Sequence, residues 1–114
     1  MFKIKRAYEP AARGDGLRIL IDRLWPRGLK KEEMKLHLWM KDVAPSTQLR
    51  TWFGHDAKRW EAFGKKYKDE LNGHPHELEY LRRLAEGHTV TLVYGAKDEQ
   101  HNHARILKVV LSGA

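Results

Sequence analysis

Two short apolar runs in this chain each stop abruptly at a cluster of charged and aromatic residues. The first run is Leu17 to Asp22 (LRILID), and the second is Thr89 to Tyr94 (TVTLVY). Continuous β-branched and aliphatic residues are typical of parallel strands that are buried on both faces. If both runs are parallel strands of one sheet, both clusters lie at its carboxyl edge, which is where open α/β sheets bind ligands.

Between and after these runs, apolar residues recur at the three- and four-residue spacing of amphipathic helices. Ser46 is expected to cap one of these helices, because its hydroxyl can accept a hydrogen bond from an orphan backbone amide. The predicted helices span Lys31 to Met40, the residues from the cap Ser46 to Phe53, Lys58 to Leu71, Pro75 to Ala85, and the residues from the cap Asp98 to about Leu111.

The amino-terminal segment Phe2 to Tyr8 alternates apolar and basic residues, which is the pattern of a half-exposed strand. Glu9 to Gly16 contains a proline and two glycines and is expected to be a loop. So short a loop suits a hairpin better than a crossover, but the direction of the first strand stays open. The order of elements predicts a single compact α/β domain over residues 1–114, with a small, mostly parallel sheet flanked by helices.

Composition limits the classes of protein to consider. The chain has 114 residues, 41% of them hydrophobic, which is typical of one folded domain. It contains no cysteine, which excludes disulfides, a cysteine-based zinc site and a thiol nucleophile. We expect a cytoplasmic location because there is no secretory signal, and we expect no membrane span because the apolar stretches are too short.

The formal net charge of +7 favours anionic partners such as nucleic acid, nucleotides or phosphorylated metabolites. Charge that serves only solubility is an equally good interpretation. Basic residues at 58–59 and 65–68 lie on the predicted helix Lys58 to Leu71. They could contact a phosphate backbone, although a solvated polar face explains them as well.

The first polar cluster, Asp22 to Gly28, follows the first buried run. A carboxylate at Asp22 is costly to bury unless it is paired, and Arg27 is expected to be a better-placed partner than Arg23. Trp25 and Pro26 offer a flat wall, while Arg27 and Gly28 can present a guanidinium group and a backbone amide to a phosphate or carboxylate. The alternative is a purely structural Asp–Arg pair that fixes a tight turn.

The second polar cluster follows the second buried run and begins one helix. His101 and His103 are candidate general acids or bases, because histidine titrates near neutral pH. They are two residues apart on a predicted helix and do not converge, so no metal site is predicted. The cluster consists of Tyr94, Lys97, Asp98, His101, Asn102 and His103.

The middle of the chain adds three candidate residues. Ser46 is interpreted as a helix cap and not a nucleophile, since no Gly-x-Ser-x-Gly turn surrounds it. Arg50 could reach the same pocket, and His55 lies in a loop that could face the edge of the sheet. No glycine-rich loop follows a strand, and no cofactor is predicted.

Four blocks of sequence, in the order DRLWPRGLKK, APSTQLRTWFGHD, RWEAFGKKYKDEL and LVYGAKDEQHNHA, resemble the YeaO-like proteins of the domain-of-unknown-function family 488. The resemblance covers Ile4 to about Val110. It implies a compact α/β fold in a bacterial or archaeal cytosolic protein and brings no activity with it. A longer branch of the family has cysteines and a Cys-His-Arg triplet near the last strand. This chain has Tyr94 at the first cysteine position and keeps only His103 of the triplet.

Three hypotheses about function follow. In the first, Arg23, Arg27 and Lys97 neutralise a small anionic ligand, a nucleotide or a phosphorylated metabolite, and Trp25 and Tyr94 enclose it. A catalytic version of this site adds Asp22, His101 or His103 as acid–base groups of a hydrolase or transferase. The second hypothesis is a nucleic-acid-binding protein that uses its basic helices, and the third is a non-catalytic interaction module. We adopt the first as a binding site, which requires the two clusters to meet around one cavity.

Overall fold

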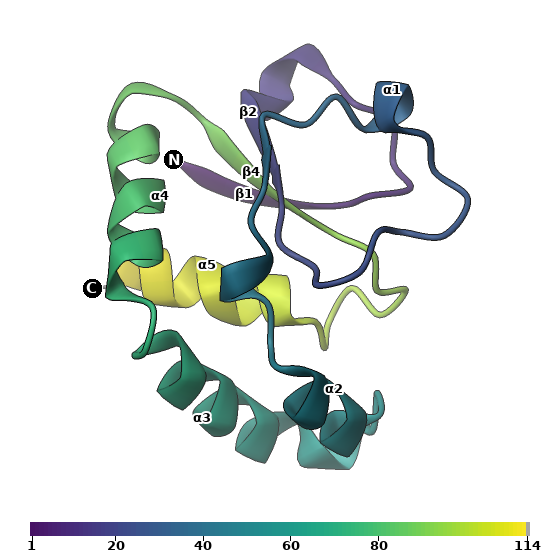
Figure 1. Cartoon of the computed structure of the whole chain (residues 1–114), viewed down its shortest axis with the longest axis vertical. Coiled ribbons are helices and arrows are strands. Elements are labelled where there is room, and N and C mark those ends of the chain that lie inside the picture. The colour runs from purple at the N-terminus through teal and green to yellow at the C-terminus, as the bar shows by residue number, and fades with distance from the viewer. Residues whose placement is uncertain (114) are drawn as a thin grey trace.

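A parallel four-stranded sheet is the centre of the computed structural model, which describes residues 1–113 (Figure 1). The strand order is β1-β4-β2-β3, and every neighbouring pair is parallel. The α/β class predicted from the sequence is therefore confirmed. The strands are β1 (Phe2–Arg6), β2 (Leu17–Leu20), β3 (Leu38–Trp39) and β4 (Val90–Tyr94).

The two apolar runs form the central strands, and their predicted parallel pairing is confirmed. Leu17 pairs with Val90 and Leu20 with Val93 along the β2–β4 ladder. Every residue of β4 is buried, as its uninterrupted apolar pattern predicts for a strand covered on both faces. The residues that follow β2 and β4 consequently leave the sheet at the same edge.

The expectation that the first loop suits a hairpin is wrong. β1 is parallel to β4 and pairs with it from Phe2 to Val90 through Arg6 to Tyr94, on the side of β4 opposite to β2. The connection therefore carries the chain past β4 without a long helix, using only the short 3-10 turn Arg13–Asp15. Its close packing requires Gly16, because a Cβ there would lie 2.2 Å from the Thr89 carbonyl oxygen.

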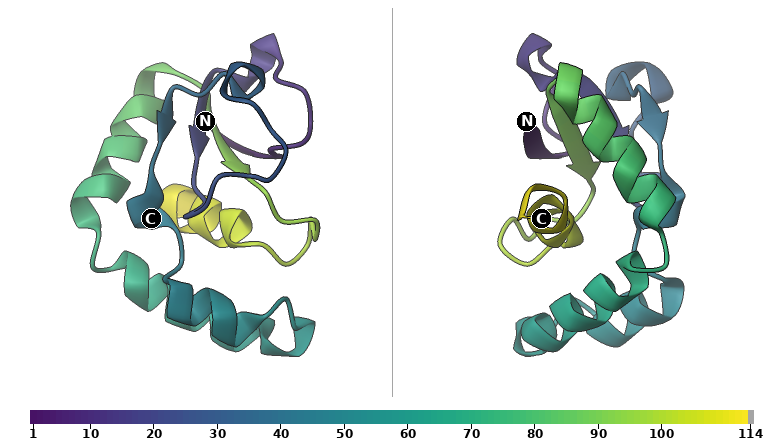
Figure 2. Two further views of the ribbon diagram at one scale, coloured as in Figure 1. Left: turned by 45° about the vertical axis from the view of Figure 1, so that its right-hand side comes forward. Right: turned by 90° about the vertical axis from the view of Figure 1, so that its left-hand side faces the viewer.

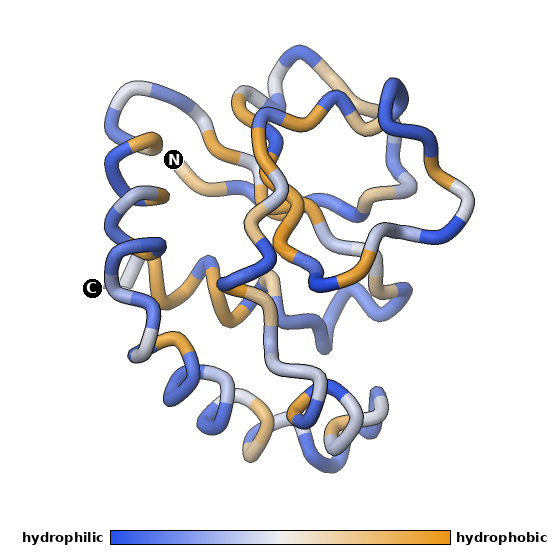
Figure 3. The backbone as a smooth tube through the Cα atoms, viewed as in Figure 1, coloured by the Kyte–Doolittle hydropathy of each residue, from blue (hydrophilic) through white to orange (hydrophobic). Residues whose placement is uncertain are grey.

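The helical spacing predicted four helices correctly in number and place after residue 46. Their apolar stripes pack with Ile19, Ile21, Val90 and Leu92 in one large hydrophobic core. Figure 3 shows apolar stretches along the central strands and along α5, and Figure 2 shows α3 and α4 following one another around one side of the molecule. The helices are α2 (Thr47–Phe53), α3 (Trp60–Leu71), α4 (Pro75–Gly87) and α5 (His103–Gly113).

The helix predicted over Lys31 to Met40 is wrong beyond its first turn. Helix α1 (Lys31–Met34) ends because Lys35 adopts the left-handed conformation, with φ of 46°. The chain then runs extended, and β3 pairs Leu38 with Ile19 at the edge of the sheet. Apolar residues three to five positions apart fitted a helix, but tertiary packing places them in a short strand.

The opposite face of the sheet is covered by coil and by α1 instead of long helices. A small core there joins Ala7, Leu20, Met34 and Val93. Trp25 and Trp39 pack against it, with their rings edge to face at 5.4 Å. This arrangement holds the segment after β2 on one side of the carboxyl edge, while the helices lie on the other.

The final helix begins later than the sequence predicted. Asn102, and not Asp98, caps α5, because its Oδ1 accepts a hydrogen bond from the Arg105 backbone N–H at 3.2 Å. Asp98 accepts from the backbone N–H groups of Gln100 and His101 and so stabilises the preceding turn. Asn102 is 2% exposed, which its place at the junction of strand, turn and helix explains.

Candidate functional site

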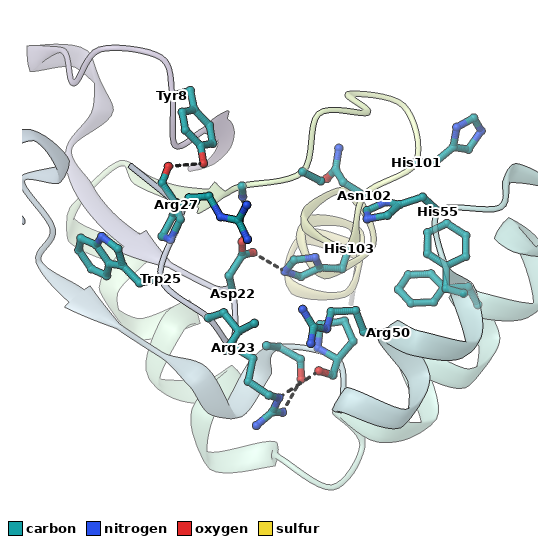
Figure 4. Close-up of a pocket in the computed structure, with 18 residues that line it drawn as sticks. Tyr8, Asp22, Arg23, Trp25, Arg27, Arg50, His55, His101, Asn102 and His103 are labelled. Atoms are coloured by element: carbon teal, nitrogen blue, oxygen red, sulfur yellow. Dashed lines mark hydrogen bonds and ion pairs between the residues drawn. The ribbon is translucent and has the colours of Figure 1, made fainter. Parts of the chain in front are cut away.

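The two polar clusters meet around one cavity of about 290 Å³ at the carboxyl edge of the sheet (Figure 4). The segment after β2 forms one side of the cavity. The segment after β4, the beginning of α5, and the helices α2 and α3 supply the rest. The parallel pairing of β2 with β4 is the cause, because it brings both strand ends to the same edge.

Nine of the sequence-predicted site residues line this cavity: Asp22, Arg23, Trp25, Arg27, Arg50, His55, His101, Asn102 and His103. The other five, Gly28, Ser46, Tyr94, Lys97 and Asp98, are not among its lining residues. Pro26, predicted with Trp25 as a wall, also lines the cavity. Lining residues that the sequence did not single out as site residues are Tyr8, Leu24, Ala44, Pro45, Phe53, Phe63, Gly95 and Ala96.

Asp22 lies at the centre of the cavity and connects the ends of the two strands. Its Oδ2 accepts a hydrogen bond from the Gly95 backbone N–H at 2.9 Å. Its Oδ1 lies 3.2 Å from His103 Nε2. The expected pairing of Asp22 with Arg27 is therefore wrong: the carboxylate is held by a backbone amide and an imidazole that lie far along the chain.

His103 completes this central pair. Its Nε2 lies 2.9 Å from the Ile21 carbonyl oxygen. A carbonyl oxygen can only accept, so Nε2 carries the proton in this contact and Nδ1 is an acceptor when the imidazole is neutral. The ring also meets the edge of buried Tyr67, with centroids 5.9 Å apart.

Three arginines line the cavity, and they differ in their partners. Arg23 donates to the backbone carbonyls of Ala44 and Pro45 at 3.2 and 3.3 Å. Arg27 and Arg50 are exposed, and neither makes an ion pair within residues 1–113. Since Asp22 is the only acidic residue in the lining, the cavity carries a formal charge of +2 with its histidines neutral.

The other two cavity histidines are positioned by their neighbours. His101 Nδ1 lies 3.0 Å from Asp98 Oδ2. Hydrogen bonds from the side chain and backbone of His101, and from the Gln100 backbone, lower the pKa of Asp98 below its ordinary value. His55 follows α2 in the left-handed region, with φ of 59°, and its ring centroid lies 6.1 Å from that of Phe53.

Aromatic side chains of α2 and α3 support all three histidines. The ring centroid of His101 lies 5.3 Å from that of Trp60, and the Phe53 and Phe63 rings stack at 4.3 Å. Sequence analysis missed Phe53 and Phe63 as cavity residues because an apolar helical stripe is typical of a core. It missed Tyr8 because the signal is purely tertiary: its hydroxyl donates to the Arg27 carbonyl oxygen at 2.8 Å.

The five predicted residues outside the lining have other places in the fold. Ser46 caps α2, as predicted, by accepting from the Leu49 N–H, and its hydroxyl donates to Glu70 at 2.5 Å. Tyr94 is 3% exposed, and burial raises the pKa of its phenol. Gly28 adopts φ of 83°, Lys97 is exposed, and Asp98 stabilises the turn before α5.

Residues 1–113 contain no group of three or more histidine or acidic side chains placed to hold a metal ion. Within the same residues, no helix combines the length and apolar character that a membrane crossing requires.

The fold and the cavity define a small α/β domain with a positively charged, partly aromatic cavity at the carboxyl edge of a parallel sheet. A family model described as "Inactive DUF488-N3 subclade" matches residues 1–114. The chain therefore belongs to the DUF488 family, and the resemblance noted in the sequence is confirmed.

Two bacterial relatives illustrate the family. The chain is 44% identical to YeaO of Escherichia coli (strain K12) over 103 residues, which covers 90% of each chain. It is 37% identical to Rv3073c of Mycobacterium tuberculosis (strain ATCC 25618 / H37Rv) over 111 residues, or 97% of this chain and 93% of the relative. Both relatives are described as uncharacterized proteins. No solved structure gave a significant match.

Proposed function

We propose that this protein binds a small anionic ligand of the phosphate class in the cavity at the carboxyl edge of its sheet. One observation carries the proposal: Arg27 and Arg50 line a cavity in which the one acidic lining residue, Asp22, accepts from the Gly95 N–H and lies 3.2 Å from His103 Nε2. Within residues 1–113 neither guanidinium group has an ion-pair partner, which favours an anion from solution.

The three arginines have different parts in this binding. Arg50 projects from α2 and Arg27 from the segment after β2, so an anion between them would be contacted from two sides of the cavity (Figure 4). Arg23 uses Nε and Nη2 to hold the Ala44–Pro45 backbone, which fixes the wall beside Arg50. A guanidinium group has five N–H donors, so Arg23 keeps donors that a ligand can use.

Binding is better supported than a reaction. A hydrolase or transferase would use Asp22, His101 or His103 to move protons. Asp22 and His103 already hold the Gly95 amide and the Ile21 carbonyl, which are structural contacts between the strand ends. The description of the matching family as an inactive subclade agrees with a site that binds without catalysing.

Isothermal titration calorimetry with inorganic phosphate and simple organic phosphates tests the proposal. We expect Arg50→Gln and Arg27→Gln each to weaken binding roughly ten- to a hundredfold, the usual loss for a hydrogen bond to a charged group. Arg13→Gln is the matched control, because Arg13 is exposed and outside the cavity. The proposal is contradicted if none of these anions binds, or if Arg13→Gln weakens binding as much as the two cavity variants do.

A further inference from the structure

The cavity is larger than an isolated phosphate ion requires. Its volume of about 290 Å³ is close to the lower end of the range of roughly 300–1,000 Å³ that is typical of pockets for organic small molecules. Alongside Arg27 and Arg50, the lining includes several apolar and aromatic side chains, namely Tyr8, Leu24, Trp25, Pro26, Ala44, Pro45, Phe53, Phe63 and Ala96. An anion bound by the arginines would leave much of this lining to a second, organic part of the ligand.

The aromatic residues come from two sides of the cavity. Figure 4 shows Trp25 on one side of the Asp22–His103 pair and His55 on the other. On the His55 side, the rings of Phe53 and Phe63 are stacked with an angle of 24° between their planes. Phe53 and Phe63 are 5% and 3% exposed and stack on each other, and Trp25 packs edge to face on Trp39, so a flat ring bound here would contact ring edges and the Leu24 side chain.

Polar groups in the same lining can bond to the edge of a heterocyclic ring. His103 and His55 both line the cavity; with Nε2 of His103 on the Ile21 carbonyl, its Nδ1 can accept from a ring amino group, and the His55 imidazole can donate or accept. Asn102 donates from Nδ2 to the Asp98 carbonyl and accepts at Oδ1 from the Arg105 N–H, so its side chain holds the turn before α5 and not the ligand. A saturated sugar or a linear dicarboxylate would leave much of the apolar lining without a matching partner.

We propose that the cavity recognises a nucleoside monophosphate unit. Arg27 and Arg50 bind its phosphate, and its base lies between the Leu24–Trp25 side and the Phe53–Phe63 side. This inference rests on the proposed anion site and specifies the ligand class for it. The same unit can arrive free or as the phosphorylated end of a single-stranded oligonucleotide.

Calorimetric titrations with inorganic phosphate, ribose 5-phosphate, adenosine, the common nucleoside monophosphates and a 5′-phosphorylated oligonucleotide test this inference. We expect at least one monophosphate to bind about tenfold more tightly than ribose 5-phosphate, because contacts of the base with the apolar lining add to the phosphate contact. Arg50→Gln should weaken every phosphate-bearing ligand in the series.

Leu24→Ala isolates the contribution of the base. Leu24 lines the cavity and is 59% exposed, and Val109 on α5 is equally exposed but lies outside it. Neither truncation removes a core side chain. We expect Leu24→Ala to weaken the monophosphate about threefold or more and to leave inorganic phosphate unchanged, while Val109→Ala changes neither.

The outcomes separate the two proposals. If ribose 5-phosphate and inorganic phosphate bind through Arg50 as tightly as every monophosphate, the anion site stands and the nucleotide inference is overturned. If no phosphate-bearing ligand binds, both fall. If the oligonucleotide binds more tightly than the free monophosphate and Leu24→Ala weakens it, the nucleoside monophosphate unit is supported and nucleic acid is its source. If the free monophosphate binds more tightly and Leu24→Ala weakens it, the ligand is the small molecule.

Discussion

At the scale of single residues, the cavity depends on how Asp22 is held. Its carboxylate bonds to an amide 73 positions further along the chain, and His103 lies against its other oxygen. From the sequence, the cost of burying Asp22 could be predicted, but its partners could not. Periodicity tells which side chains share a face, whereas the choice of Gly95 and His103 over Arg27 depends on which strand lies beside β2.

Replacing Gly95 by alanine tests this arrangement. A Cβ at Gly95 would lie 3.0 Å from Asp22 Oδ2, so the carboxylate or the backbone has to move. We expect Gly95→Ala to lower the free energy of unfolding by about 1–2 kcal/mol and to weaken phosphate binding, because the floor of the cavity shifts. Urea denaturation and calorimetry measure the two effects.

Gly87→Ala provides the control for this prediction. A Cβ at Gly87 meets no atom within 4 Å, and the residue ends helix α4 without a positive φ. We expect Gly87→Ala to change the free energy of unfolding by no more than about 0.5 kcal/mol. If Gly95→Ala is instead as stable as the wild type and binds phosphate equally well, the cavity does not depend on the present position of Asp22.

At the scale of elements, the sequence predicted the central strands and the later helices but not the covering of the second face. Helices α2 to α5 carry apolar stripes that face the core, and α2 and α5 also begin at side-chain caps, Ser46 and Asn102. The coil between β1 and β2 has neither, and it is held by Asp15. The Asp15 carboxylate accepts hydrogen bonds from Lys5 of β1 and Arg18 of β2. The backbone carbonyl of Asp15 accepts a hydrogen bond from the Thr91 hydroxyl of β4. Contacts among three strands leave no local pattern.

The Asp15 network predicts a loss of stability in acid. Burial tends to raise the pKa of Asp15, but hydrogen bonds from the Ala12 amide, Lys5 and Arg18 hold it below its ordinary value of 3.8. A carboxylate with a lowered pKa stabilises the fold at neutral pH. That stabilisation is lost as the pH falls through 3.8 towards the pKa of the folded state.

Urea unfolding of Asp15→Asn between about pH 7 and pH 3 measures this contribution. The variant should be less stable than the wild type by about 3 kcal/mol at neutral pH, since Arg18 is 3% exposed and loses its charged partner. The difference should shrink in acid. Asp69→Asn, on the exposed side of α3, should follow the wild-type curve. A constant difference at all pH values would show that Asp15 does not carry the acid sensitivity.

At the scale of the whole molecule, the location of the cavity was predictable but much of its character was not. Two parallel strands that end in polar clusters indicated the carboxyl edge, and the structure brings those clusters together there. The aromatic side of the cavity could not be foreseen. Phe53 and Phe63 follow the same helical spacing as core residues and are buried in the core, and only the packing of α2 and α3 places them at the wall of the cavity.

The net charge of +7 does not determine whether anions bind in the cavity or on the basic face of α3. Part of that face is already occupied, since Lys66 Nζ lies 5.0 Å from the Trp52 ring centre and the Arg59 guanidinium 5.1 Å from it. Lys65 and Lys68 remain exposed. The double variants Arg27→Gln/Arg50→Gln and Lys65→Gln/Lys68→Gln each remove two positive charges, so any difference between them reports position and not net charge.

If the cavity is the functional site, the arginine variant should lose phosphate binding about a hundredfold or more, while the lysine variant stays within about twofold of the wild type at physiological salt. If the protein instead binds nucleic acid through α3, the lysine variant should lose affinity for DNA or RNA, and the slope of log affinity against log salt should become shallower by one to two units. Equal, small losses in both variants would favour a role for the charge in solubility alone. Because the two variants share one net charge and alter only exposed side chains, calorimetry and a salt titration on this pair decide between a ligand cavity and a basic surface.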